Sequence, residues 1–370
     1  MKLIAQVKLD STPEQTDALK RTLETANAAA NYASDYAWAN KVFRQFDLHR
    51  ALYYDLRERF ALSAQVTVRV LGKVADAYKL DHKTKRTFKP LGSIAYDERI
   101  LAWRLADSTV SLWTVAGRLR LPFLTGERQL ALLRSLQGEA DLLYRDGACY
   151  LYQTCDVEGP PPEEPLDYLG IDLGIVSLAV DSDGEVHSGA GVERGRRIYA
   201  HRRRNLQRKG TKAARRKLKR LAGKQARYQT DTNHVISKCV VRKAQDSGRA
   251  IILENLKGIR GRVTVRRRQR ARHANWSFSQ LRDFIVYKAA LAGVLVLFVD
   301  PRNTSRTCPL CDCIDKANRP NQASFSCTSC GYAAPADVVA AGVIRARAVV
   351  NRPMVSTTTE VVASGTSRFL

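Results

Sequence analysis

The sequence predicts a mixed α/β fold built in two parts, and three features of the 370-residue chain lead to this prediction. The first part begins with helical patterns and continues with strand patterns. A proline-rich segment, EGPPPEEPLD at residues 158–167, can then form neither helix nor central strand and is expected to be a linker. Beyond it, strands and helices alternate, as in a sheet covered by helices.

The N-terminal part is expected to contain a short strand and then helices. A helix is predicted to begin at Pro13, because Thr12 can cap it and proline suits the first helical position. Apolar residues follow at helical spacing, at Leu19, Leu23, Ala26 and Ala30. A second helical region is predicted within residues 46–79.

From about Arg86 the pattern changes to strands. The stretch STVSLWTVAGRLRLPF, at residues 108–123, alternates apolar and polar residues around a glycine turn. The stretch LLYRDGACYLYQTCDV predicts a hairpin across Asp146 and Gly147. These patterns complete an N-terminal mixed domain.

Past the linker, YLGIDLGIVSLAVDSDGEV suggests two strands joined by a tight turn. RAIILENL and VLVLFVD are read as short buried strands, and WSFSQLRDFIVYKAALAG as an amphipathic helix between them. The last stretch, from Pro353, is expected to be a mobile tail.

The charge of the chain points to a polyanionic partner. The 61 basic and 36 acidic residues give a net charge of +25, and nucleic acid is the commonest polyanion in cells. Membrane binding is the rival explanation, but no apolar run approaches the roughly 20 residues that span a bilayer. The first residues, MKLIAQVKLDSTPEQ, are not expected to be a signal peptide.

Two strongly basic stretches are the expected contacts to nucleic acid. Every charged residue from Arg194 to Arg227, and again from Lys257 to Arg272, is lysine or arginine. A solvated helix face is the plainer alternative, yet such faces normally mix charges of both signs. The candidate contacts are Arg202, Arg203, Arg204, Arg215, Arg216, Lys217, Lys219, Arg266, Arg267 and Arg268.

Five of the eight cysteines crowd between Cys308 and Cys330, which favours a metal site over a disulfide framework in a reducing cytosol. Two C-x2-C pairs can close a tetrahedral zinc shell, which would make the zinc structural. The ligands are Cys308, Cys311, Cys327 and Cys330, although Cys313 could replace Cys311.

Three acids stand in unusual surroundings. Asp172 lies inside the apolar strand pattern LGIDLGIVSLAV, and Glu254 ends the apolar strand pattern AIILE. Asp337 lies at the start of a predicted helix, where a capping or ion-paired role explains it equally well. A buried, unpaired carboxylate is costly, so a divalent cation is a good partner. Together the three acids could hold two Mg2+ ions about 4 Å apart.

The sequence does not support a histidine metal site or nucleotide hydrolysis. The six histidines form no metal-spaced pair, and no Walker-type lysine motif occurs, which argues against a nucleotide-hydrolysing motor.

Four motifs, GIDLGIVSLAV, IILENLKGI, NTSRTCPLC…CTSCG and ADVVAAGVI, resemble in this order those of TnpB proteins. These are RNA-guided nucleases of certain insertion sequences, related to type V CRISPR effectors. The resemblance is strong across roughly residues 166–350 and looser before them. The chain departs from the family at Val339 and at Gly342 or Val343, where asparagines are frequent.

The resemblance implies an α/β, RNase H-like (RuvC) nuclease domain with an inserted zinc ribbon, preceded by a helical recognition part and a β-barrel-like wedge part. Asp172, Glu254 and Asp337 would be the catalytic acids that bind Mg2+ or Mn2+, and the four cysteines would hold one structural Zn2+. The implied boundaries are 1–12 for a wedge strand, 13–85 helical, 86–159 wedge, 160–166 linker, 167–303 nuclease, 304–334 zinc ribbon, 335–352 nuclease and 353–370 tail.

The expected function is RNA-guided cleavage of double-stranded DNA next to a short flanking motif, with a guide RNA as partner, no membrane, and a monomer on the RNA. The location expected is the cytoplasm of a bacterium or archaeon, in association with the nucleoid. The alternatives are RNA-guided DNA binding without cleavage, and transposase-like DNA strand transfer.

Overall fold

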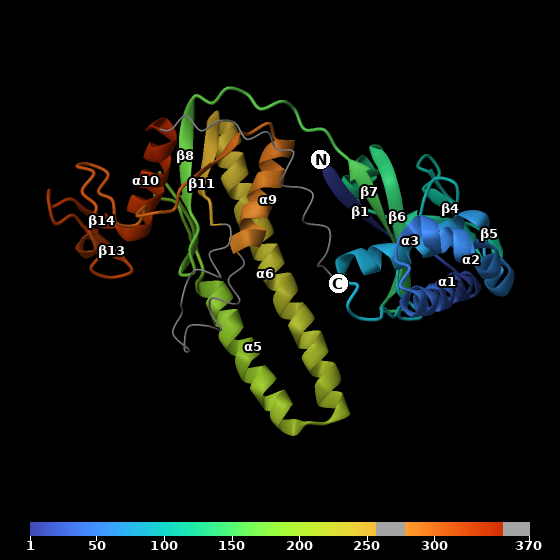
Figure 1. The fold of residues 1–370 in the computed structure, drawn as a ribbon. Helices are drawn as coiled ribbons and strands as arrows, with labels where there is room; N and C mark the ends of the chain where they lie inside the picture. The colour runs from blue at the N-terminus through green and yellow to red at the C-terminus, as the bar shows by residue number, and fades with distance from the viewer. Residues whose placement is uncertain (257–277, 351–370) are drawn as a thin grey trace. The chain divides into compact units, whose positions relative to one another are not determined.

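The computed structural model describes residues 1–256 and 278–350 and divides the chain into two compact units, Met1–Glu158 and Gly159–Leu370. Both units combine helices with a sheet (Figure 1), which confirms the mixed α/β prediction. Within the described residues, no helix has the length and apolar character required to cross a membrane.

The first unit packs helices against a seven-stranded antiparallel sheet of order β2-β6-β7-β1-β5-β4-β3. Its strands are β1 (Lys2–Leu9), β2 (Ile94–Tyr96), β3 (Leu101–Arg104), β4 (Thr109–Thr114), β5 (Gly117–Leu124), β6 (Leu136–Arg145) and β7 (Ala148–Asp156). Its helices are α1 (Pro13–Asn40), α2 (Gln45–Phe60), α3 (Ala64–Leu80) and α4 (Glu127–Leu133).

The predicted helix start is confirmed, since the Thr12 side chain accepts a hydrogen bond from the Gln15 N–H and Pro13 is the first residue of α1. The second helical region is two helices rather than one. Ala61 takes a left-handed conformation with φ 50°, which ends α2, and the hydroxyl of Ser63 then caps α3.

Both predicted strand pairs are confirmed. β4 and β5 pair around Gly117, and β6 and β7 pair across the turn at Asp146 and Gly147. Side chains also join strands from distant places in the strand order. The Tyr96 hydroxyl on β2 donates to the Trp113 carbonyl on β4 at 2.9 Å, which shows that the sheet curls toward closure.

The second unit contains a five-stranded sheet of order β10-β9-β8-β11-β12, in which β8, β11 and β12 are parallel neighbours. The strands are β8 (Asp167–Asp172), β9 (Ser177–Asp181), β10 (Val186–Ser188), β11 (Arg249–Glu254) and β12 (Val296–Val299). The helices are α5 (Ala190–Lys209), α6 (Lys212–Asp246), α9 (Phe278–Leu291) and α10 (Ala336–Val350). A short 3-10 helix η1 (Lys316–Asn318) and a small hairpin of β13 (Ser324–Ser326) and β14 (Ala333–Pro335) precede α10.

Side chains of alternating direction give this sheet two apolar faces. Leu169, Ile171 and Leu253 pack with α6 and α9, whereas Ile252, Leu297 and Val299 pack with Ile344 and Ala348 of α10. Figure 1 accordingly shows α6 and α9 on one side of the sheet and α10 on the other. Val339, which departs from the family pattern, is buried in the apolar cluster that also contains Phe325 and Cys308.

The proline-rich segment is docked on the second unit along part of its length. The Glu163 N–H donates to the Gly293 carbonyl at 3.3 Å, and the Leu166 N–H donates to the Gly248 carbonyl at 2.9 Å. A Cβ atom on Gly159 would lie 2.0 Å from the Ala290 oxygen, so the chain leaves no room for a side chain there.

Candidate functional site

Two of the three predicted acids end adjacent parallel strands. Ile171 of β8 is paired in register with Leu253 of β11, and Asp172 and Glu254 are the next residues on their strands. Because the carboxyl ends of parallel strands meet at one edge of a sheet, both acids lie at the same edge. Both side chains are partly buried.

Helix α10 brings Asp337 to the same edge. A Cβ atom on Gly170 would lie 2.2 Å from the Ala341 oxygen and 2.7 Å from the Arg345 nitrogen, so α10 packs directly on the backbone of β8. Asp337 is one turn before Ala341, in the first turn of α10, where the helix dipole favours a negative charge. The Ser177 hydroxyl on β9 donates to Asp337 Oδ2 at 3.1 Å.

The electrostatics of Asp172 show that the three acids share one neighbourhood. Burial, followed by repulsion from the charges of Glu254 and Asp337, raises the pKa of Asp172 to about 7, and Arg319 opposes this shift. Burial also raises the pKa of Glu254, and a hydrogen bond donated by the Thr304 hydroxyl opposes that rise. Concentrated negative charge in a partly buried place favours the binding of a cation.

An arginine stands at the third acid. Arg319 donates a hydrogen bond to Asp337 Oδ1 at 2.9 Å, and both side chains are about one-quarter exposed. Across the described part of the chain, a group of three or more possible metal ligands within 4.8 Å of one another occurs at four cysteines, and the three acids do not meet that closely.

The acids nevertheless have the oxygen donors that Mg2+ and Mn2+ prefer. Asp172, Glu254 and Asp337 are the residues that would hold such ions. Ser177, Thr304 and Arg319 were not assigned a role from the sequence, since their contacts to the acids depend on how distant segments of the chain come together. Thr304 lies within the motif NTSRTCPLC, but nothing in the spacing of this motif points to Glu254.

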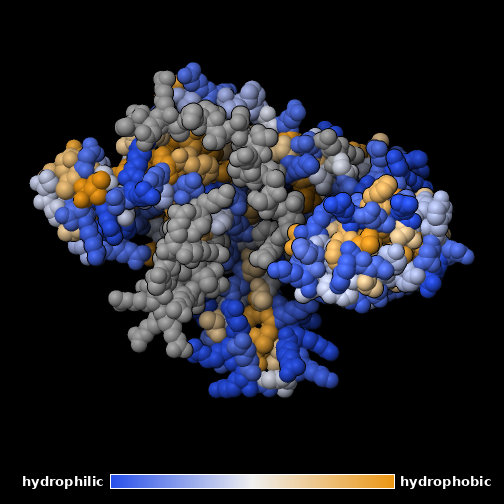
Figure 2. All heavy atoms as spheres, in the orientation of Figure 1, coloured by the Kyte–Doolittle hydropathy of each residue, from blue (hydrophilic) through white to orange (hydrophobic). Residues whose placement is uncertain are grey.

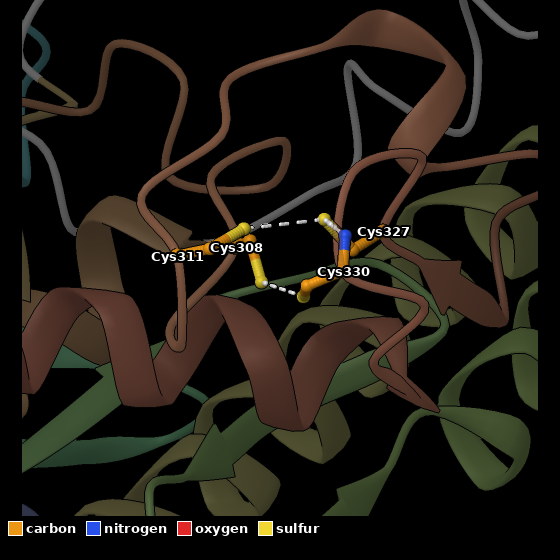
Figure 3. Close-up of side chains that lie close together, drawn as sticks. All are labelled: Cys308, Cys311, Cys327 and Cys330. Carbon is orange, nitrogen blue, oxygen red and sulfur yellow. Dashed lines mark hydrogen bonds between the residues drawn. The ribbon is translucent and has the colours of Figure 1, made fainter.

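The four predicted cysteines come together (Figure 3). The sulfur atoms of Cys308 and Cys330 lie 3.6 Å apart, and those of Cys311 and Cys327 lie 3.5 Å apart. Four sulfurs each about 2.3 Å from a central zinc would be separated by about 3.8 Å, whereas a disulfide needs about 2.05 Å. The cluster therefore fits a four-coordinate ion, and Cys313 lies outside it.

Backbone N–H groups support a thiolate in this cluster. The Cys330 N–H lies 3.5 Å from the sulfur of Cys327, and this contact is the main cause that lowers the pKa of the Cys327 thiol to about 6.

The fully buried side chain of Asn318 connects the two halves of the ribbon. Its amide group donates to the carbonyls of Arg306 and Cys313 and accepts from the Thr328 N–H, so it joins both sides of the ribbon.

The first basic stretch forms a helical hairpin of α5 and α6. Gly210 and Thr211 make the turn, Gly210 with φ 64° and Thr211 as the cap of α6. α5 has no buried residue in the structure, and its one acid, Glu193, pairs with Arg196 and Arg197. Figure 2 shows hydrophilic side chains around the hairpin end and a narrow hydrophobic seam between the helices.

The candidate nucleic-acid contacts on this hairpin are Arg202, Arg203 and Arg204 on α5, and Arg215, Arg216, Lys217 and Lys219 on α6. All are exposed or partly exposed. Arg266, Arg267 and Arg268 lie outside the described residues.

Two family sequence models match the chain: one runs from the end of the first unit into the second, and the other lies within the second unit. Residues 149–260 match a family described as "Probable transposase", OrfB_IS605, and residues 278–344 match the Cas12f1-like TNB domain. The second match contains the four cysteines and Asp337.

Curated proteins give the same relationship. The chain is 32% identical to the CRISPR-associated endodeoxyribonuclease Cas12f1 of Sulfoacidibacillus thermotolerans over 59% of this chain and 53% of that protein. It is 35% identical to the TnpB-like protein MJ0751 of Methanocaldococcus jannaschii over 33% of this chain and 44% of that protein. The chain thus spans about half the length of these relatives.

Solved structures share the fold. A Cas12f1–sgRNA–target DNA complex matches with a TM-score of 0.63 and 15% identity, over 90% of this chain and 83% of that chain. The mini-RNA-guided endonuclease CRISPR-Cas_phi3 matches with a TM-score of 0.58 and 10% identity, over 96% and 93%.

In sequence and in fold, the chain is similar to TnpB-like proteins and to Cas12f effectors. The resemblance to the TnpB family predicted from the sequence is confirmed.

Proposed function

We propose that this chain is an RNA-guided DNA endonuclease that cleaves DNA beside a short flanking motif. The relatives named as endodeoxyribonucleases and the fold shared with RNA-guided effectors support this function. We also propose that the second unit has the RuvC-like arrangement, for which the five-stranded sheet with helices on both faces gives support.

The observation that carries the proposal is the convergence of three acids from distant parts of the sequence. Asp172, Glu254 and Asp337 come from β8, β11 and α10, and the charges of the latter two act on the first. Two bound Mg2+ or Mn2+ ions would supply an activated water molecule and stabilise the leaving oxygen of a phosphodiester.

The chain's own residues orient this site. Ser177 and Arg319 each hold one oxygen of Asp337, so that the carboxylate has a fixed rotation. Arg319 also places a positive charge beside the acids, where a phosphate group of the substrate would otherwise meet only negative charge. The cysteine cluster is proposed to hold a structural Zn2+ that maintains the loop carrying Arg319.

The proposed partners are a guide RNA and double-stranded target DNA. The cationic end of the α5–α6 hairpin suits phosphate backbones, which it would contact without reading sequence. Base pairing with the guide would supply target specificity. The reaction would take place on the DNA of a bacterial or archaeal cell, with one chain on each RNA.

The test is to purify the chain with its bound RNA, sequence that RNA, and add Mg2+ with a matched DNA target. A discrete RNA with a constant scaffold and a variable end, together with cut DNA, is the expected result. DNA that stays intact while it is bound would show the second candidate function, RNA-guided binding without cleavage. The ion pair between Arg319 and Asp337 favours this second candidate, because it engages one of the acids.

A transposase-like reaction is distinguished by its products. Joined DNA strands formed without any bound RNA would contradict both RNA-guided functions.

A further inference from the structure

We propose that Thr304 is a positioning residue for Glu254, and that the turn before the cysteine ribbon exists in part to present its hydroxyl. This inference rests on the proposed function, since it concerns how one proposed catalytic acid is held. Thr304 belongs to neither a strand nor a helix and lies 50 residues after Glu254 in the chain.

The first support is the contact itself. The Thr304 hydroxyl donates a hydrogen bond to Glu254 Oε1. Thr304 is 4% exposed, so this hydroxyl has little water to bind and is committed to acceptors of the protein. The Pro301 carbonyl lies 3.2 Å from the same hydroxyl and can only share its one proton.

The second support is the rigidity of the turn that carries Thr304. Asn303 has a left-handed φ of 59°, and its carbonyl accepts hydrogen bonds from the backbone N–H groups of Arg306 at 2.9 Å and Thr307 at 3.0 Å. The Asn318 amide group then holds the Arg306 carbonyl at 2.9 Å. The backbone around Thr304 is therefore fixed on both sides, which defines where its hydroxyl points.

The third support is the matching arrangement at Asp337. There, the Ser177 hydroxyl and Arg319 hold the carboxylate, as the Thr304 hydroxyl holds Glu254. Thr304 lies four residues before Cys308, and Arg319 follows the buried Asn318 within the ribbon. The cysteine ribbon thus supports contacts to two of the three acids.

Glu254 needs such a partner for a physical reason. Its carboxylate is partly buried and its negative charge acts on Asp172, so repulsion favours rotamers that separate the two groups. A fixed hydrogen bond to one oxygen opposes that movement. Loss of an outer partner of a metal-binding side chain typically lowers metal affinity or activity by about 10–100-fold.

The experiment compares Thr304→Val and Thr304→Ala with Thr304→Ser in the full chain bound to its RNA. The cleavage rate of a matched target, the Mn2+ concentration at half-maximal rate, and the affinity for the target are measured. The valine and alanine variants should lose about 10–100-fold in rate or require correspondingly more Mn2+, with unchanged target affinity. The serine variant, which keeps the hydroxyl, should recover most of the rate.

Thr307→Val is the matched control. It removes a threonine hydroxyl from the same turn, one that bonds the Asn303 carbonyl and not an acid. Its metal requirement should equal that of the wild type. Equal losses in the Thr304→Val, Thr304→Ser and Thr307→Val variants would overturn the proposal, as would a Thr304→Val variant with wild-type rate and metal requirement.

Failure of the proposed function is recognised separately, because the wild-type chain would then not cut DNA. In that case Mn2+ binding to the wild type and to the Thr304 variants, measured by electron paramagnetic resonance, still tests the role of Thr304. Weaker binding in Thr304→Val than in Thr304→Ser and Thr307→Val supports it, and equal binding refutes it.

Discussion

The pKa of Asp172 reflects both of the other acids, since the charges of Glu254 and Asp337 each repel its ionised form. Asp172→Asn should therefore reduce cleavage on the order of 10³-fold, as losses of groups that stabilise transition-state charge do. Folding and RNA affinity should persist, because asparagine has the same shape and removes the repulsion. Cleavage and RNA-binding assays on the same preparation measure both effects.

Asp183→Asn is the control for this substitution. Asp183 is paired with Arg249 at 2.8 Å and with Lys243 at 3.1 Å, and it takes no part in the acid cluster. It should cut DNA at the wild-type rate. Cleavage that survives Asp172→Asn would show that Asp172 has been given the wrong role.

Lys73 in the first unit gives a pH-dependent prediction. Its Nζ donates to Asn27 Oδ1 at 2.6 Å and to the Ser93 carbonyl at 2.7 Å, and burial lowers its pKa from 10.5 to about 8. Between pH 8 and 10.5 the unfolded chain holds a proton on Lys73 that the folded chain has released. The free energy of unfolding therefore rises with pH across this interval, and the gain is lost as the pH falls through about 8.

The comparison is with Lys73→Met, which has no titrating group there. From pH 8 to 10.5 the wild type should gain roughly 3 kcal/mol in unfolding free energy relative to the variant. Thermal unfolding of the full chain at several pH values measures the difference. Melting curves that shift in parallel would mean that Lys73 titrates normally.

At the residue scale, the sequence could identify groups that are anomalous in their own surroundings. Asp172 and Glu254 are conspicuous because they interrupt or end apolar strands, and the cysteines because of their spacing. Thr304, Ser177 and Arg319 are ordinary polar residues with no local pattern that marks them, and their importance comes from contacts over 50, 160 and 18 positions. Such contacts depend on tertiary folding, which local patterns do not encode.

At the scale of elements, strands with clear alternation and turns with clear signals were predictable. The hairpin at Asp146 and Gly147 is an example, because both residues take positive φ values of 51° and 85°. The break between α2 and α3 was missed, since Ala61 is a good helix former and nothing local marks its left-handed conformation. The docking of the proline-rich segment was also missed, because it depends on Gly293 and Gly248 in distant turns.

The cysteine ribbon is the element whose loss should affect the site at a distance. Cys327→Ser should release the metal, expected at about one zinc per chain, and lower thermal stability. Cleavage should fall as well, since Thr304 and Arg319 are held by the ribbon and its preceding turn. Metal analysis, thermal unfolding and cleavage assays on one sample check the three effects.

Two cysteine controls sharpen this result. Cys239→Ser changes an exposed cysteine on α6 and should keep both zinc and activity. Cys313→Ser should also keep zinc, because Cys313 lies outside the cluster of four. Zinc lost from Cys313→Ser and retained by Cys311→Ser would restore the alternative ligand set considered from the sequence.

At the scale of the whole molecule, the sequence specifies how much positive charge there is, and the structure shows where part of it lies. The net charge is +25, and no acid occurs between Arg194 and Arg227. Folding places this stretch on α5 and on the first half of α6, two packed helices of which α5, with 20 residues, is roughly 30 Å long. Cations spaced along a rigid hairpin of that length can follow about one turn of a nucleic-acid duplex.

Replacing Arg215, Arg216, Lys217 and Lys219 with alanine should therefore weaken RNA binding and make it less dependent on salt. Each lost phosphate contact reduces the slope of log affinity against log salt concentration by about 0.7 to 0.9, so four contacts would reduce it by about 3. Filter binding at several salt concentrations measures the slope, and alanine maintains the helix.

The control removes the same number of charges from places where each cation already has an acidic neighbour. Arg21, Arg59, Lys79 and Arg145 pair with Asp17, Asp55, Asp76 and Asp146 on the surface of the first unit. If net charge alone governs affinity, the two quadruple variants should lose the same slope. If the hairpin contacts phosphates directly, the salt dependence of RNA affinity should fall in the α6 variant and stay unchanged in the control. The reason is that cations that already have an acid beside them release few counterions on binding.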